Sequence, residues 1–135
     1  MEWYEAGDTS AHGTHVFGTI GADDSNDEGI PISMIPTDAG ICYVIVRVFG
    51  SDDNFGTYTS NIIDGLNWAV AQGAKVINLS LGGPGFVAGE EAAYVNAYNA
   101  GALAIASAGN TYETTYQYPA SFNTVVSVGA TDQNE

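Results

Sequence analysis

The sequence predicts an α/β fold built on a mostly parallel sheet. Short apolar runs of strand length alternate along the chain with longer segments in which apolar residues recur at helical spacing. Strands that are separated by helices pair in parallel through right-handed crossovers. The predicted strands are 41–49, 76–81, 103–106 and 125–128, and the predicted helices are 10–20, 59–73 and 90–100.

The first part of the chain is expected to hold one helix, one acidic loop and one strand. The helix is predicted over 10–20, with the Ser10 side chain as its N-cap. The loop over 21–38 is rich in acids, Gly and Pro. The run 41–49 is apolar apart from Arg47, as expected of a strand that is buried on both faces of a sheet.

The rest of the chain alternates helix and strand. Ile62, Leu66 and Ala69 recur at helical spacing. Gly73 and Gly101 are expected to end the second and third helices, because glycine readily adopts the left-handed conformation that closes a helix. Each of these helices is followed by a short apolar run, which we expect to be a buried strand.

Two motifs stand where predicted strands end. Residues 80–83 close one strand and residues 107–110 follow the next. The carboxyl ends of parallel strands meet at one edge of a sheet, and ligand sites gather at that edge. We therefore expect the two motifs to lie together.

The charge balance limits the partners of the protein. Its 135 residues carry 16 acids against only Arg47 and Lys75, and the formal net charge is −14. Such a surface repels phosphate groups, so we expect no nucleic-acid partner. No apolar run reaches the ~18 residues of a membrane span, so we expect no membrane partner. The acidic start Met1–Glu5 is unlike the basic n-region of a secretory signal.

The single cysteine, Cys42, excludes a disulfide within the chain. It lies inside the apolar run 41–49. We therefore expect a buried, unreactive thiol, because burial among apolar groups raises the pKa of a thiol.

Three runs of the sequence contain the residues that point to a family. They are Ala-His-Gly-Thr-His-Val-Phe-Gly-Thr-Ile at 11–20, Val-Ile-Asn-Leu-Ser-Leu-Gly-Gly-Pro at 76–84 and Ala-Ser-Ala-Gly-Asn at 106–110. In this order the three runs resemble the subtilisin-like serine proteases, which are the subtilases of the peptidase S8 family. Phe17 stands where the family usually has a small residue. The resemblance implies a three-layer α/β fold and a serine endopeptidase, which hydrolyses peptide bonds by acyl transfer.

The sequence lacks two motifs of that family. The catalytic aspartate ends an apolar strand upstream of the histidine in the family, and the catalytic serine lies in a downstream Gly-Thr-Ser-Met-Ala motif. Neither is present in residues 1–135. We therefore expect one incomplete peptidase domain that is inactive by itself, from a parent protein that is secreted or extracellular. The alternative is a non-catalytic relative that binds extended peptides.

The resemblance implies two catalytic residues. His12 matches the histidine that acts as general base, since neutral imidazole accepts a proton near pH 7. Asn110 matches the asparagine whose amide stabilises the oxyanion of the tetrahedral intermediate. A structural histidine or a metal ligand is the alternative for His12, although no His-Glu-x-x-His motif is present. A turn asparagine is the alternative for Asn110.

The resemblance also implies three substrate-binding segments. Two are expected to form the walls of a pocket, and the third is a second edge against which an extended peptide pairs as an added strand. Small residues in both walls suggest a pocket that is open to large apolar side chains. The wall and edge residues are Ser80, Leu81, Gly82 and Gly83; Ser107, Ala108 and Gly109; and Asn54, Phe55 and Gly56.

The acidic loop resembles the calcium-binding loop of the family. Calcium takes six to eight oxygen ligands from carboxylates, amides and backbone carbonyls. The best matches are the side chain of Asn26 and the carbonyls of Glu28 and Ile30. The alternative is an acidic loop that is solvated and binds no metal.

Overall fold

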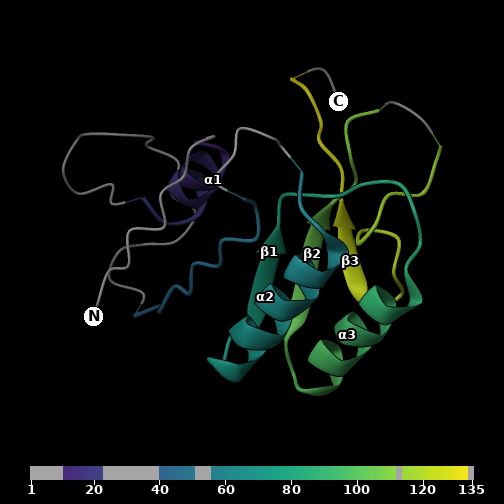
Figure 1. Cartoon of the computed structure of the whole chain (residues 1–135). Helices are drawn as coiled ribbons and strands as arrows, with labels where there is room; N and C mark the ends of the chain where they lie inside the picture. Colours follow the sequence, from purple (N-terminus) through teal and green to yellow (C-terminus); the bar gives the residue numbers. More distant parts are fainter. Residues whose placement is uncertain (1–10, 23–39, 51–55, 112–113, 134–135) are drawn as a thin grey trace. The chain divides into compact units, whose positions relative to one another are not determined.

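The computed structural model describes residues 11–22, 40–50, 56–111 and 114–133 of the chain. The chain divides into two compact units, residues 1–57 and residues 58–135. Figure 1 labels the helices and strands of both units.

The first unit contains the helix α1 (His12–Gly21). The predicted N-cap, Ser10, is outside the described residues, and the N-cap position is held by Ala11 instead. Ala11 has φ of 58° and contributes no side-chain cap; its carbonyl accepts the first helical hydrogen bond from the His15 N–H, at 3.0 Å. Phe17 meets Tyr43 edge to face, with ring centroids 5.1 Å apart, and this contact joins α1 to the segment 40–50.

The prediction of a buried strand over 41–49 is wrong. The segment is irregular, and among the described residues no strand pairs with it. An apolar run becomes a strand only where a neighbouring strand accepts its backbone hydrogen bonds. Here Arg47 and Thr57 donate instead to the carbonyls of Phe49 and Val48. Cys42 in this segment is exposed, so the prediction of a buried thiol is wrong as well.

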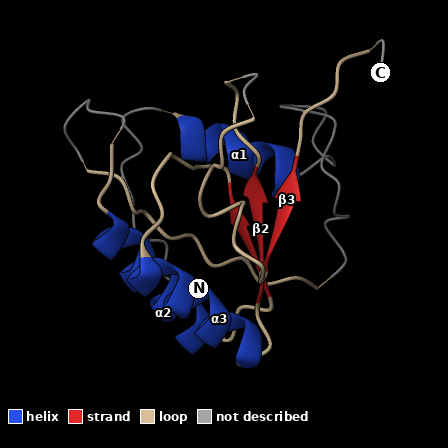
Figure 2. Ribbon diagram, turned by 90° about the vertical axis from the view of Figure 1, so that its right-hand side faces the viewer, coloured by secondary structure: helices blue, strands red, loops and turns tan. Residues whose placement is uncertain are grey.

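The second unit contains the helix–strand alternation that the sequence predicts. The strands β1, β2 and β3 form a three-stranded sheet in that order, and both neighbouring pairs are parallel. The helices α2 and α3 lie side by side over one face of this sheet (Figures 1 and 2). The elements are α2 (Thr59–Ala71), β1 (Val76–Leu79), α3 (Ala88–Asn99), β2 (Leu103–Ser107) and β3 (Val125–Val128).

Glycines end both helices of the second unit, as predicted. Gly73 and Gly101 have φ of 88° and 84°, a backbone conformation that side chains other than glycine rarely adopt. Each glycine N–H bonds a carbonyl of the last helical turn. No helix among the described residues is long and apolar enough to cross a membrane.

The core lies between the two helices and the sheet face that they cover. It contains Leu66 of α2, Tyr94 of α3, Leu79 of β1 and Ala106 of β2, and the last two are partners in the sheet register. The prediction of a buried strand at 76–81 is confirmed for one face of the strand only. Side chains alternate along a strand, and the other face carries exposed apolar residues. This open face consists of Val76, Leu103, Val126 and Val128.

Truncation of a side chain should distinguish the two faces. Leu79→Ala should lower the free energy of unfolding by about 2–5 kcal/mol, because it empties a core position that is 9% exposed. Val76→Ala is the control, since Val76 lies in the same strand and is 64% exposed; it should change stability by less than about 1 kcal/mol. Chemical denaturation of both variants measures the difference, and equal losses would contradict the assignment of the core.

Candidate active site

The sheet register brings the two predicted motifs to one edge. Leu79 of β1 is opposite Ala106 of β2, so Ser80 and Ser107 are the next residues along neighbouring strands. A cavity of about 240 Å³ opens there. The prediction that the motifs lie together is confirmed, because residues of both line this cavity. Its lining consists of Asn78, Ser80, Ile105, Ala106, Ser107, Gly109, Asn110, Val128, Gly129 and Ala130.

Short polar contacts fix the serines at this edge. The Asn78 side-chain amide donates to the Ser80 hydroxyl at 3.0 Å. The Gly109 N–H donates to the Ser107 hydroxyl oxygen at 3.3 Å. Asn110 is exposed directly after Gly109, and its carboxamide is therefore accessible from solvent at the cavity.

One backbone edge of the wall 80–83 is already hydrogen-bonded. Gly83 and Tyr118 form an antiparallel bridge in which each N–H donates to the other's carbonyl at 2.9 Å. Along an extended backbone, neighbouring residues direct their hydrogen-bonding groups to opposite edges. Gly82 therefore directs its backbone groups away from Tyr118. A Cβ at Gly82 would lie 3.2 Å from the Tyr118 carbonyl oxygen, so this close approach favours glycine.

Gln117 is a site residue that sequence reasoning missed. Gly109 has φ of 100°, and a Cβ built there would lie 3.0 Å from the Gln117 Cγ. The Gln117 side chain therefore occupies the space beside Gly109. The opening of the pocket to large apolar side chains stays a prediction. Nothing in the sequence around Gln117 indicates the contact, because the two residues are brought together by the path of the chain after β2.

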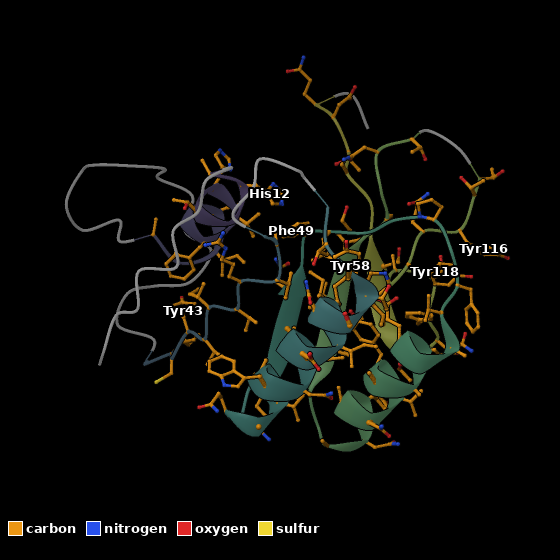
Figure 3. All side chains as sticks on the ribbon, in the orientation of Figure 1. His12, Tyr43, Phe49, Tyr58, Tyr116 and Tyr118 are labelled. Carbon is orange, nitrogen blue, oxygen red and sulfur yellow. The ribbon has the colours of Figure 1, made fainter. Side chains whose placement is uncertain are left out.

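An aromatic cluster stands behind the wall 80–83. Tyr118 and Phe122 have ring centroids 4.9 Å apart, and Phe122 is 5.5 Å from Tyr94 of α3. Phe86 meets both Tyr118 and Phe122 edge to face, at 5.7 and 6.0 Å. Tyr118, which is labelled in Figure 3, thus contacts the wall through its backbone and the rest of the cluster through its ring.

Two titrating groups near this cluster have shifted pKa values. Burial raises the pKa of the Glu90 carboxyl above its usual 4.5. Burial, together with the negative charge of Glu90, raises the pKa of the Tyr94 hydroxyl. Both residues are buried and neither lines the cavity, so neither is a candidate for acid–base catalysis there.

The remaining predicted site residues lie in the first unit. His12 is the first residue of α1 and is exposed (Figure 3). Gly56 is also exposed. The residues outside the described part of the chain are Asn54 and Phe55 of the second edge, and Asn26, Glu28 and Ile30 of the predicted calcium loop. Among the described residues, no group of three or more His, Cys, Asp or Glu side chains could hold a metal ion.

Comparison with known proteins gives consistent matches. The family model described as "Subtilase family" matches residues 1–135. Subtilisin DY of Bacillus licheniformis is 37% identical over 132 residues, which are 95% of this chain and 46% of that protein. The major intracellular serine protease of Bacillus subtilis is 39% identical over 128 residues, which are 91% of this chain and 38% of that protein. The chain thus spans less than half the length of these relatives.

Solved structures of proteases also match this chain. The subtilisin-like protease Apa1 of the Antarctic psychrotroph Pseudoalteromonas sp. AS-11 has a TM-score of 0.83 and 40% identity, over 98% of this chain and 30% of that one. The patellamide maturation protease PatA has a TM-score of 0.77 and 30% identity, over 93% of this chain and 45% of that one.

Replacement of Gly109 should test the geometry of the wall. Gly109→Ala should lower stability by about 1–2 kcal/mol, because an L-residue is strained at positive φ. Gln117→Ala in the same background should recover part of the loss, since it removes the side chain that the new Cβ meets. Gly89→Ala in α3 is the control: its Cβ would meet nothing within 4 Å, and alanine is favoured in a helix. Equal thermal melts for the Gly89 and Gly109 variants would contradict this wall geometry.

Proposed function

This chain belongs to the subtilase family, and from that premise we propose that it forms part of the active site of a serine endopeptidase. The observation that carries the proposal is the shared edge of β1 and β2, where Ser80 of one wall, Ser107 and Gly109 of the other, and Asn110 line one cavity. In this proposal, the nucleophilic serine and the orienting aspartate come from parts of the protein outside these 135 residues.

The role we propose for His12 is that of general base. Peptide hydrolysis by a serine requires a group that removes the hydroxyl proton and then returns it to the leaving amine. A neutral imidazole does both near pH 7. His12 suits this role because it is exposed at the first position of a helix, followed by Gly13, which leaves the backbone accessible.

The role we propose for Asn110 is that of oxyanion donor. Attack on a peptide carbonyl places a negative charge on its oxygen, and a fixed N–H donor stabilises that charge. The Asn110 carboxamide suits this role because it is exposed at the cavity, on a turn held by the bond between Gly109 and Ser107. A donor placed in advance needs no reorganisation when the charge forms.

The substrate we propose is an extended peptide segment of a peptide or protein. Gly82 directs its backbone groups to the edge that Tyr118 does not use, and an added strand could pair with them there. The Gln117 side chain lies beside Gly109, which belongs to one of the two walls. We therefore propose that the side chain received by this pocket lies against a carboxamide, which favours small or polar side chains over large apolar ones.

Replacement of the oxyanion donor tests the proposal. In the complete protein, Asn110→Ala should lower kcat by about 10²–10³-fold with little change in KM. This fold-change is the one known for loss of one oxyanion donor from a subtilisin. The donor acts on the transition state more than on the bound substrate. Steady-state kinetics on a chromogenic peptide measure both constants.

Two controls accompany that measurement. His12→Ala should abolish turnover, whereas His15→Ala, in the same helix, should retain most of kcat. An Asn110→Ala variant with unchanged kcat and a lower melting temperature would make Asn110 a turn residue and would remove it from the active site. Sequencing of the gene on both sides of these codons decides between the endopeptidase and a non-catalytic peptide-binding relative, since only the former requires the aspartate and serine motifs.

We also propose that the acidic loop binds calcium, through the Asn26 side chain and the carbonyls of Glu28 and Ile30. The support is the chemistry of these oxygen donors and the acids around them. An extracellular location of the protein belongs to the same proposal, because extracellular calcium sites work at millimolar calcium.

Calcium should raise the melting temperature of the complete protein. Binding to the folded state alone stabilises it by linkage, and Asn26→Ala should remove most of the shift. Magnesium should do less, because it demands a tighter octahedral site. Equal shifts from both ions would instead indicate general screening of the acidic surface.

A further inference from the structure

Tyr43 of the segment 40–50 lies in a notch on the second half of α1. Its ring meets that of Phe17 edge to face, with centroids 5.1 Å apart and an interplanar angle of 84°. A Cβ built at Gly21 would lie 2.8 Å from the Tyr43 Cζ and 2.9 Å from the Tyr43 hydroxyl oxygen. The end of the ring thus fills the space that a side chain at Gly21 would need. Phe17 and Gly21 are one turn apart and share a helix face, so together they form this notch.

The helix α1 has little stability of its own. It has ten residues, whereas isolated helices shorter than about 12–15 residues are marginal in water. Its N-cap residue, Ala11, has φ of 58° and makes no side-chain cap hydrogen bond, and none of the helical residues is buried. Glycine disfavours a helix because it loses more backbone freedom than other residues, and α1 contains Gly13, Gly18 and Gly21. Packing against a neighbouring segment is therefore needed to hold α1.

The aromatic contact is a feature of this chain. Phe17 stands where the subtilases usually have a small residue, so membership of the family does not imply a ring pair at this place. Tyr43 is 37% exposed. The pair is thus a surface contact between α1 and the segment 40–50 and does not belong to a closed core.

The orientation of α1 decides where His12 lies. His12 is the first residue of this helix, and backbone hydrogen bonds between successive turns make an α-helix move as one body. The notch lies toward the opposite end. A tilt of about 10° about that end would move the start of the ten-residue helix by about 2 Å, at a rise of about 1.5 Å per residue. A misplacement of about 1 Å at a reacting group can lower a rate by about 10²-fold.

We propose that Tyr43 is a positioning residue for His12. Its ring, seated against Phe17 and Gly21, fixes the far end of α1 and thereby the place at which the helix presents its first residue. Tyr43 acts through the helix and is not itself a catalytic residue. The inference rests on the proposed role of His12 as general base.

Steady-state kinetics on the complete protein test the proposal. Tyr43→Ala should lower kcat by about 10–100-fold with little change in KM, because a general base acts in the chemical step rather than in substrate binding. Tyr43→Phe keeps the ring and should retain most of kcat. Ile45→Ala is the matched control, since Ile45 lies in the same segment and is 57% exposed; its kcat should equal that of the wild type.

Gly21→Ala tests the notch with Tyr43 in place. Alanine favours a helix more than glycine does, but its Cβ would meet the Tyr43 ring, so kcat should fall although the helix itself is strengthened. Because Tyr43→Ala removes the ring that this Cβ meets, the double variant should be no slower than Tyr43→Ala alone. The single variant Gly21→Ala also keeps the test decisive if Tyr43→Ala does not fold.

Hydrogen exchange reports on α1 independently of activity. The His15 N–H bonds the Ala11 carbonyl at 3.0 Å, and its protection should fall in Tyr43→Ala and be retained in Tyr43→Phe.

Three results would overturn the inference and leave the proposed function standing, provided that His12→Ala is inactive. They are an unchanged kcat in Tyr43→Ala, a lowered kcat with unchanged protection of the His15 amide, and losses of kcat that add in the double variant. Turnover retained by His12→Ala would instead overturn the proposed function, and the positioning role of Tyr43 with it.

Discussion

The parallel register of β1, β2 and β3 is the constraint on which the rest of the second unit depends. It sets Leu79 opposite Ala106, and Ser107 opposite Val128. The chain leaves β1 and β2 at the same edge, so residues far apart in sequence reach one cavity. The helices α2 and α3 keep this register by covering one face with a common core.

A second set of contacts turns this edge into two walls. The segment 117–118 serves both, because Gln117 lies against Gly109 while the backbone of Tyr118 holds Gly83. The aromatic cluster behind Tyr118 extends to Tyr94 of α3. The wall that we propose to bind substrate is therefore continuous with the core.

Local periodicity and glycine chemistry were enough to predict the helices, strands and helix ends of the second unit, because those elements bury one face against each other within a short stretch of chain. The prediction of a strand over 41–49 was wrong, because an apolar run does not reveal whether a partner strand is available. The prediction of a buried Cys42 thiol was wrong for the same reason. Gln117 could not be predicted, because its contact with Gly109 depends on tertiary structure. The burial of Glu90 could not be predicted, because a charged residue at the start of a helix is usually solvated.

The central claim is that the carboxyl edge of β1 and β2 receives an extended peptide. The most direct measurement is a titration of the ¹⁵N-labelled chain with a capped, extended peptide, followed by NMR. The account predicts that chemical shifts change at the backbone amides of Gly82 and Gly109 and at the side-chain amide of Asn110, while the exposed surfaces of α2 and α3 stay unchanged. Shift changes that are confined to those helices, or none at millimolar peptide, would contradict it.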